Sequence, residues 1–178
     1  MSGIVETVVQ RAKAEKRAYT RGEERPLGSY AALVGGYSAA VVGLVGASRL
    51  LGREAPERPH PGDIALAGVA TLRLTRLVAR APILSPLRAP FTEYHGTSGP
   101  AELSESVRGR GVRKAIGELL TCPFCLSQWT ATAFTFGLVV APRATRVAAT
   151  VLTIGATSDV LQLAYSVAER HAEGNPDG

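Results

Sequence analysis

The feature that most constrains this chain is a run from Leu119 to Pro142 that contains no charged residue. A helix rises about 1.5 Å per residue, so a helix made of this run can cross the hydrocarbon core of a bilayer, which is about 30 Å thick. A second uncharged run extends from Pro26 to Ser48. Two such runs in 178 residues leave little room for a separate soluble domain, and the sequence predicts a small membrane protein.

Small residues supply much of the apolar content. Hydrophobic residues make up 46% of the chain, but Phe, Trp and Tyr only 6%, and there are 19 glycines. Such a composition suits helices that approach one another closely in lipid. The net charge of +5 comes from basic residues that flank the apolar runs, a pattern typical of membrane topology. We therefore expect a lipid bilayer, and no nucleic acid, as the chain's environment.

The pattern predicts an all-α fold, a polytopic membrane helix bundle with four transmembrane helices and a short N-terminal amphipathic helix. Residues 1–25 form a cytoplasmic leader, 26–168 the membrane domain and 169–178 a disordered tail. The spans are expected at about 28–50, 63–84, 116–141 and 145–168, with a cytoplasmic loop at 85–115. A soluble amphipathic helix is the alternative for 63–84, because that segment carries three arginines.

The distribution of Lys and Arg predicts that both termini face the cytoplasm. Thirteen of these residues lie in the leader, in region 80–114 and in the tail, whereas five lie in the two connections expected on the outside. The expected location is therefore the plasma membrane, with several passes.

A row of small residues follows one face of the first span, at Gly35, Ala39, Gly43 and Ala47. Such a row lets another helix backbone come close. The approaching helix could belong to the same chain, to a second copy in a homodimer or to another membrane protein.

Charged residues of three spans are expected at similar depths near the inner leaflet. Helical spacing places Arg73, Arg76 and Arg80 on one face, and Glu118 and Asp159 come from the third and fourth spans. Buried charges of this kind normally pair or face water. The sequence predicts that Asp159 pairs with Arg76 or Arg73. The cluster either holds the helices together or forms a polar pocket that binds an anionic headgroup, an ion or a small solute.

Cys122 and Cys125 form a Cys-x-x-Cys motif where the third span begins. Three interpretations remain open. The pair could be a redox site, a metal site or two packed thiols beside a proline, Pro123, in the first helical turn. Zinc would need two further ligands, for which His95 and His171 are candidates on the cytoplasmic side. If the thiols react, Cys122 is expected to be the more reactive, because free N–H groups at the helix start stabilise a thiolate.

Three segments together resemble the DUF1360 family, a group of small bacterial membrane proteins of unknown function. They are Leu72–Val78, Pro86–Phe91 and Ile116–Cys125 with Trp129. The resemblance extends roughly from Asp63 to Ala168, and it implies an integral membrane protein without indicating an activity.

We expect a non-enzymatic membrane scaffold or partner-binding protein. Two alternatives remain, a cytosol-facing thiol-redox or metal-binding protein and a small transporter component that uses the Arg and Asp residues. Four helices without an internal repeat make the transporter the weaker of these.

Overall fold

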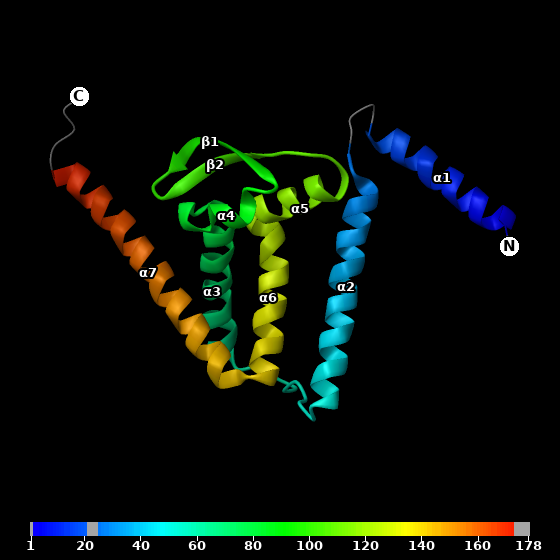
Figure 1. The fold of residues 1–178 in the computed structure, drawn as a ribbon. Helices are drawn as coiled ribbons and strands as arrows, with labels where there is room; N and C mark the ends of the chain where they lie inside the picture. The colour runs from blue at the N-terminus through cyan, green and yellow to red at the C-terminus, as the bar shows by residue number, and fades with distance from the viewer. Residues whose placement is uncertain (1, 21–24, 173–178) are drawn as a thin grey trace.

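The computed structural model describes residues 2–20 and 25–172, and this part of the chain is mostly helical with one small β-hairpin (Figure 1). The elements in chain order are α1 (Ser2–Thr20), α2 (Leu27–Leu50), α3 (Pro61–Arg80), the 3₁₀ turn η1 (Pro82–Leu84), α4 (Ser85–Arg88), β1 (Thr92–Gly99), β2 (Glu102–Val107), α5 (Gly111–Thr121), α6 (Pro123–Val140) and α7 (Pro142–Ala172). The predicted tail is partly wrong, because residues 169–172 continue α7 and 173–178 lie outside the described residues.

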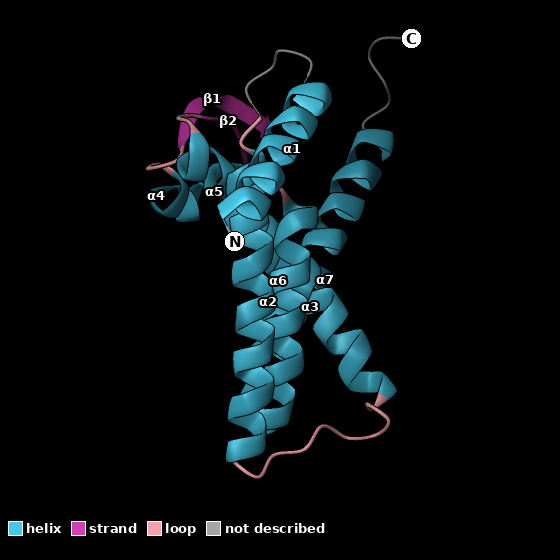
Figure 2. Cartoon of the chain, turned by 90° about the vertical axis from the view of Figure 1, so that its right-hand side faces the viewer, coloured by secondary structure: helices cyan, strands magenta, loops and turns pink. Residues whose placement is uncertain are grey.

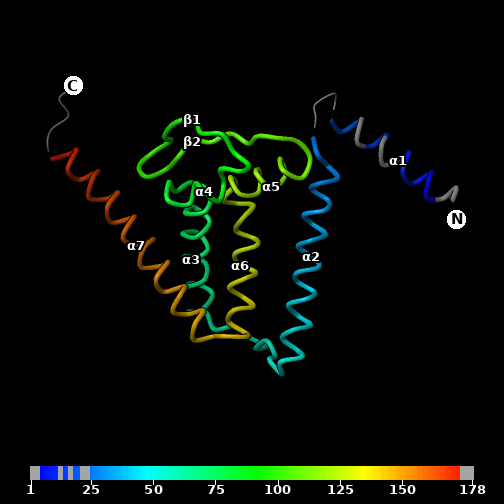
Figure 3. Tube along the Cα trace, viewed as in Figure 1, coloured from blue at the N-terminus to red at the C-terminus, as the bar shows by residue number. Residues whose placement is uncertain are grey.

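Four long helices, α2, α3, α6 and α7, run between two ends of the molecule (Figures 1 and 2). The hairpin, α4, α5 and the last turns of α7 gather at one end, together with α1. The connection 51–60 and the turn between α6 and α7 lie at the other end, as the chain trace also shows (Figure 3). Hence successive long helices run in opposite directions.

The core lies where α3 meets α6 and α7, and small side chains form most of it. Ala70, Phe134 and Ala149 are buried together, with Leu66 and Leu152 packed against them. At the turn between α6 and α7, an added Cβ on Gly137 would lie 2.7 Å from Thr145 Oγ1. Small residues thus let these helices approach closely, as in helix packing within lipid.

Most large apolar side chains on α2 and α7 point outward. Among the described residues, Ser48 is the only buried one in α2, and Ala149 is the only buried one in α7. The exposed fractions of Val42 and Val151 are 71% and 64%, and many neighbours are similar. A water-soluble fold of this length would bury such side chains, so the arrangement suits an apolar surrounding.

The hairpin corrects the prediction of an all-α fold and of a loop at 85–115. Strands β1 and β2 pair antiparallel from Thr92 opposite Val107 to Gly99 opposite Glu102, with two irregularities in register. Ala101 has φ of +56° in the tight turn between them. We call residues 82–121, which comprise η1, α4, the hairpin and α5, the cap. It covers the ends of α3 and α6 (Figure 1).

Two helices of the described chain, α2 and α7, are long and apolar enough to cross a membrane by length and composition, instead of the four predicted. The other two fall short for different reasons. Three arginines and Asp63 lower the apolar content of α3. The predicted third span is interrupted at Cys122, which leaves 18 residues in α6, with polar Ser127 and Gln128 near its start.

Candidate functional site

The Cys-x-x-Cys motif forms a corner between two helices. α5 ends at Thr121, Cys122 has extended backbone angles (φ −104°, ψ 103°), and α6 begins at Pro123. Proline suits the first helical position because its missing N–H would have no helical partner there. Pro123 therefore lies in the first turn of a helix, as predicted. This helix is α6, and α5, which precedes it, is a separate helix.

Both thiols are free and touch each other at this corner. The Sγ atoms lie 2.6 Å apart, with the Cys125 thiol donating to Cys122 Sγ. Cys122 also caps α6, because its sulfur accepts the backbone N–H of Cys125 at 3.2 Å. Two hydrogen bonds thus point at the Cys122 sulfur. Cys122 is half-buried, whereas Cys125 is exposed.

The two histidines considered as further zinc ligands occupy other places. His95 lies on β1 with Nε2 2.6 Å from Ser106 Oγ, and His171 lies near the end of α7 with Nδ1 2.9 Å from the carbonyl of Val167. Within residues 2–20 and 25–172, no group of three His, Cys, Asp or Glu side chains comes together as a metal site requires. The corner therefore offers two thiols as ligands.

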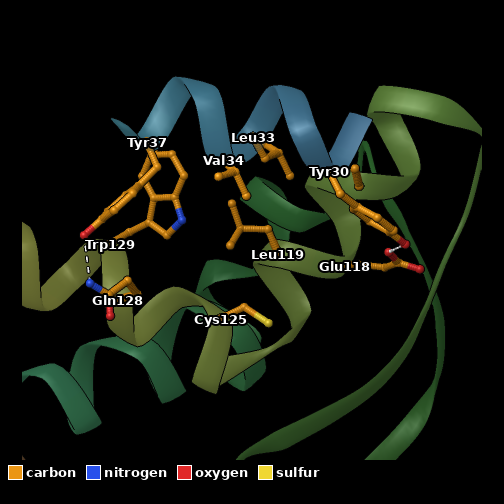
Figure 4. Close-up of a pocket in the computed structure, with 10 residues that line it drawn as sticks. Tyr30, Leu33, Val34, Tyr37, Glu118, Leu119, Cys125, Gln128 and Trp129 are labelled. Atoms are coloured by element: carbon orange, nitrogen blue, oxygen red, sulfur yellow. Dashed lines mark hydrogen bonds between the residues drawn. The ribbon is translucent and has the colours of Figure 1, made fainter. Parts of the chain in front are cut away.

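A largely apolar cavity of about 350 Å³ lies on one side of the corner, between α2 and the α5–α6 corner (Figure 4). Tyr30 donates to Glu118 at one end. At the other end Tyr37 packs edge-to-face on Trp129, with ring centroids 5.1 Å apart, and accepts from Gln128 Nε2 at 2.7 Å. Cys125 borders this cavity.

A polar recess lies on the other side of the corner, under the hairpin. It has a volume of about 490 Å³ and is bordered by Arg76 and Arg80 of α3, Ser98 and Glu102 of the hairpin, and Cys122 and Phe124. Arg76 forms an ion pair with Glu102. The two thiols of the motif therefore face different surroundings, one cationic and one apolar.

The predicted polar cluster is divided into separate contacts. Asp159 forms an ion pair with Arg73. Of the two predicted partners, Arg76 and Arg73, the second is therefore confirmed. Gly155 of α7 lies beside Arg73, whose Nε would be in ordinary van der Waals contact, at 3.5 Å, with an added Cβ. Arg76 pairs with the hairpin instead, and Glu118 accepts from a tyrosine. Arg80 borders the recess.

Sequence reasoning missed Arg88, the most deeply buried charged residue among those that the structure describes. Its side chain is fully buried and binds both carboxylate oxygens of Glu105, at 2.7 and 3.1 Å. It also donates to the carbonyls of Val78 and Ala81, at 2.7 and 3.1 Å. One guanidinium thus joins α4, the hairpin and the end of α3. Its position in the Pro86–Phe91 segment, which contributed to the family resemblance, was the available signal.

The row of small residues on α2 makes no close packing contact in the described chain. Gly35, Ala39, Gly43 and Ala47 are all exposed, and an added Cβ on Gly35 or Gly43 would meet nothing within 4 Å. The face of α2 that meets α5 and α6 instead carries Tyr30, Leu33 and Tyr37.

These observations define a small, mostly helical protein with two helices of membrane length and a dithiol at a helix corner. The chain belongs to the DUF1360 family, described as "Protein of unknown function", which it matches over residues 66–165. It is also 32% identical over 106 residues to the sporulation protein YjcA of Bacillus subtilis (strain 168), covering 58% of this chain and 90% of that protein. No solved structure matches it. The matched region includes the cap and the corner but excludes α1 and α2.

Proposed function

We propose that this protein is a non-enzymatic membrane scaffold that crosses the plasma membrane four times and presents its cap to a partner in the cytoplasm. The observation that carries the proposal is the outward direction of apolar side chains on α2 and α7, around a core of small and polar residues. Such an arrangement is favourable in lipid and unfavourable in water. The alternating directions of the four long helices agree with four passes.

The charges support the orientation. The end that carries the cap also holds the two richest groups of basic residues, in the leader and in region 80–114. Basic segments remain on the cytoplasmic side of bacterial membranes. In this arrangement α3 and α6 cross the bilayer beside α2 and α7. The ion pair of Arg73 and Asp159 lies between helices, as intramembrane charges require.

Accessibility of introduced cysteines tests the four passes. In a Cys122→Ser, Cys125→Ser background, Glu57→Cys in the connection 51–60 should react with an impermeant maleimide added to whole spheroplasts. Ala101→Cys in the hairpin turn should react only in inverted vesicles. Reaction of both positions from the same side would contradict the four-pass arrangement.

Photo-crosslinking tests the scaffold role. The Tyr94 side chain is 62% exposed on the hairpin, so a photoreactive residue at this position should give a discrete adduct with a partner. Arg88→Gln should abolish the adduct while the protein stays in the membrane, because the cap loses its central contact. A photoreactive residue at Glu57 serves as the matched control. Equal adducts from both positions, or none from Tyr94, would count against the scaffold.

A second candidate is a cytosol-facing dithiol switch. Its support is the direct contact of the two free thiols at the corner. The switch would consist of thiol–disulfide exchange: a small-molecule disulfide accepts two electrons from the pair and leaves as two thiols while the pair becomes a disulfide, and an excess of cytoplasmic thiols reverses the exchange. An oxidised fraction that follows the thiol–disulfide ratio of the buffer, measured by mass change on alkylation, would support it and would give the midpoint potential. A pair that stays reduced at every ratio would exclude it.

A further inference from the structure

The polar recess under the hairpin carries an unbalanced positive charge. Arg76 is neutralised by Glu102. Arg80, one turn further along α3 and half-buried, makes no hydrogen bond or ion pair in the part of the chain that the structure describes. A partly desolvated guanidinium without an anion is unfavourable, so the recess favours an anionic ligand.

The start of α6 adds to this preference. The helix begins at the recess with Pro123 and Phe124, and it is 18 residues long. The helix dipole attracts anions, and the N–H of Phe124 is the first that this helix offers, because Pro123 has none and the N–H of Cys125 donates to Cys122 Sγ. The hydroxyl of Ser98 borders the same space and can donate a hydrogen bond. A cation with a planar fork of donors, a hydroxyl and a helix start together form a setting that suits a phosphate group.

We propose that this recess binds an anionic phosphate group, with Arg80 as its principal contact. An acidic phospholipid headgroup and free phosphate share this chemistry. The lipid source rests on the four-pass arrangement, in which the recess lies at the cytoplasmic interface. The side chain of Phe124 at its edge is 88% exposed and would reach the acyl region beside the headgroup.

Cys122 provides a reporter, because its thiol borders the recess. The Cys125→Ser protein is placed in nanodiscs of phosphatidylcholine, whose headgroup is neutral overall, or of phosphatidylcholine with phosphatidylglycerol. The rate of maleimide labelling at Cys122 is then measured. We expect labelling about tenfold slower with phosphatidylglycerol, the protection expected from one charge-assisted contact.

Arg80→Gln should remove this difference between lipids, and Arg80→Lys should keep most of it. The matched control is Arg49→Gln, an exposed arginine at the other end of the molecule, which should keep it in full. The same rates are measured in phosphatidylcholine nanodiscs with added inorganic phosphate. Protection by phosphate that Arg80→Gln removes identifies free phosphate as the source, and protection by phosphatidylglycerol alone identifies the headgroup.

Two results would overturn the proposal. In one, neither phosphatidylglycerol nor phosphate slows the labelling of the Cys125→Ser protein. In the other, the lipid effect persists in Arg80→Gln, which would trace it to the surface potential of the membrane. Both results leave the four-pass arrangement intact, because the accessibility of Glu57→Cys and Ala101→Cys tests that arrangement separately.

Discussion

Cys122 is the residue whose surroundings most favour a chemical role. The N–H of Cys125 and the thiol of Cys125 both donate to its sulfur, and two arginines border the recess that it faces. Hydrogen-bond donors and cations beside a sulfur are typical of reactive cysteines. Cys125 receives no comparable donor in the described structure and borders the apolar cavity.

We therefore expect Cys122 to be alkylated first in the native protein. The measurement is partial labelling of inverted vesicles by an impermeant maleimide, followed by peptide mass mapping. Cys122 should carry most of the label at early times. Earlier labelling of Cys125 would refute the expectation, and resistance of both thiols until a chelator is added would point to a bound metal.

The pair of Arg73 and Asp159 should contribute to stability. Asp159→Ala leaves an arginine without its partner between α3 and α7, and we expect a loss of about 1–2 kcal/mol, typical of polar contacts between membrane helices. Glu57→Ala, in an exposed connection, is the control and should have little effect. Unfolding in mixed micelles measures both changes.

A charge exchange makes the test specific. Arg73→Asp combined with Asp159→Arg should recover part of the loss, whereas Arg76→Asp with Asp159→Arg should not. Recovery only in the double variant with Arg76→Asp would mean that Asp159 contacts Arg76 instead of Arg73.

At the residue scale, the sequence predicted that Asp159 pairs with an arginine of α3, and this is confirmed. Depth from the helix rise allowed either Arg76 or Arg73 and did not select Arg73. Arg76 has nearly the same depth, but it pairs with Glu102, which lay in an expected loop. Likewise the N-cap of α3 is His60, and Asp63 in its first turn binds Arg146 at 2.7 and 2.8 Å. Both of these contacts depend on the fold as a whole.

At the scale of elements, the packing of α5 on the hairpin depends on Gly117. An added Cβ would lie 2.6 Å from Val107 Cγ1 and 3.0 Å from the backbone oxygen of Phe91. Gly117→Ala should therefore lower stability by about 1–3 kcal/mol, although alanine is the better helix former.

Gly35→Ala offers a matched comparison within a helix, because nothing lies within 4 Å of its added Cβ. This change should be neutral or stabilising by up to about 1 kcal/mol. Thermal unfolding of both variants in detergent is the measurement. Equal effects at the two positions would mean that α5 does not pack on the hairpin as described.

The elements that the sequence failed to predict have weak patterns. The strands lack clear alternation, and Gly96, Ser98, Gly99 and Pro100 resemble a loop. The corner at Cys122 was hidden because the uncharged run begins at Leu119, inside α5, and continues through the break. The helix α2 was easier to predict, because a long run without charge is typical of a helix in lipid and rare in a helix that faces water.

At the scale of the whole molecule, the family match divides the chain into a part that matches the family and a part that lies outside the match. Residues 66–165 include most of α3 and α7 with the cap and α6, whereas α2 lies outside. α2 meets the matched part through its tyrosines, and the apolar cavity lies at that junction. The polar recess, by contrast, is bordered only by residues inside the matched region. A role shared across the family is therefore expected at the recess rather than at the cavity.

The length of α7 has a consequence for the proposed arrangement in a membrane. Its 31 residues extend over about 46 Å, against a hydrocarbon core of about 30 Å. Figure 1 shows it diverging from α3 toward its C-terminal end. A membrane helix this long either tilts or extends beyond the hydrocarbon core, and the thickness of the bilayer decides how much it does of each. In the proposed arrangement we therefore expect the angle of α7 to change with the thickness of the host membrane, while the ion pair of Arg73 and Asp159 holds this helix to α3.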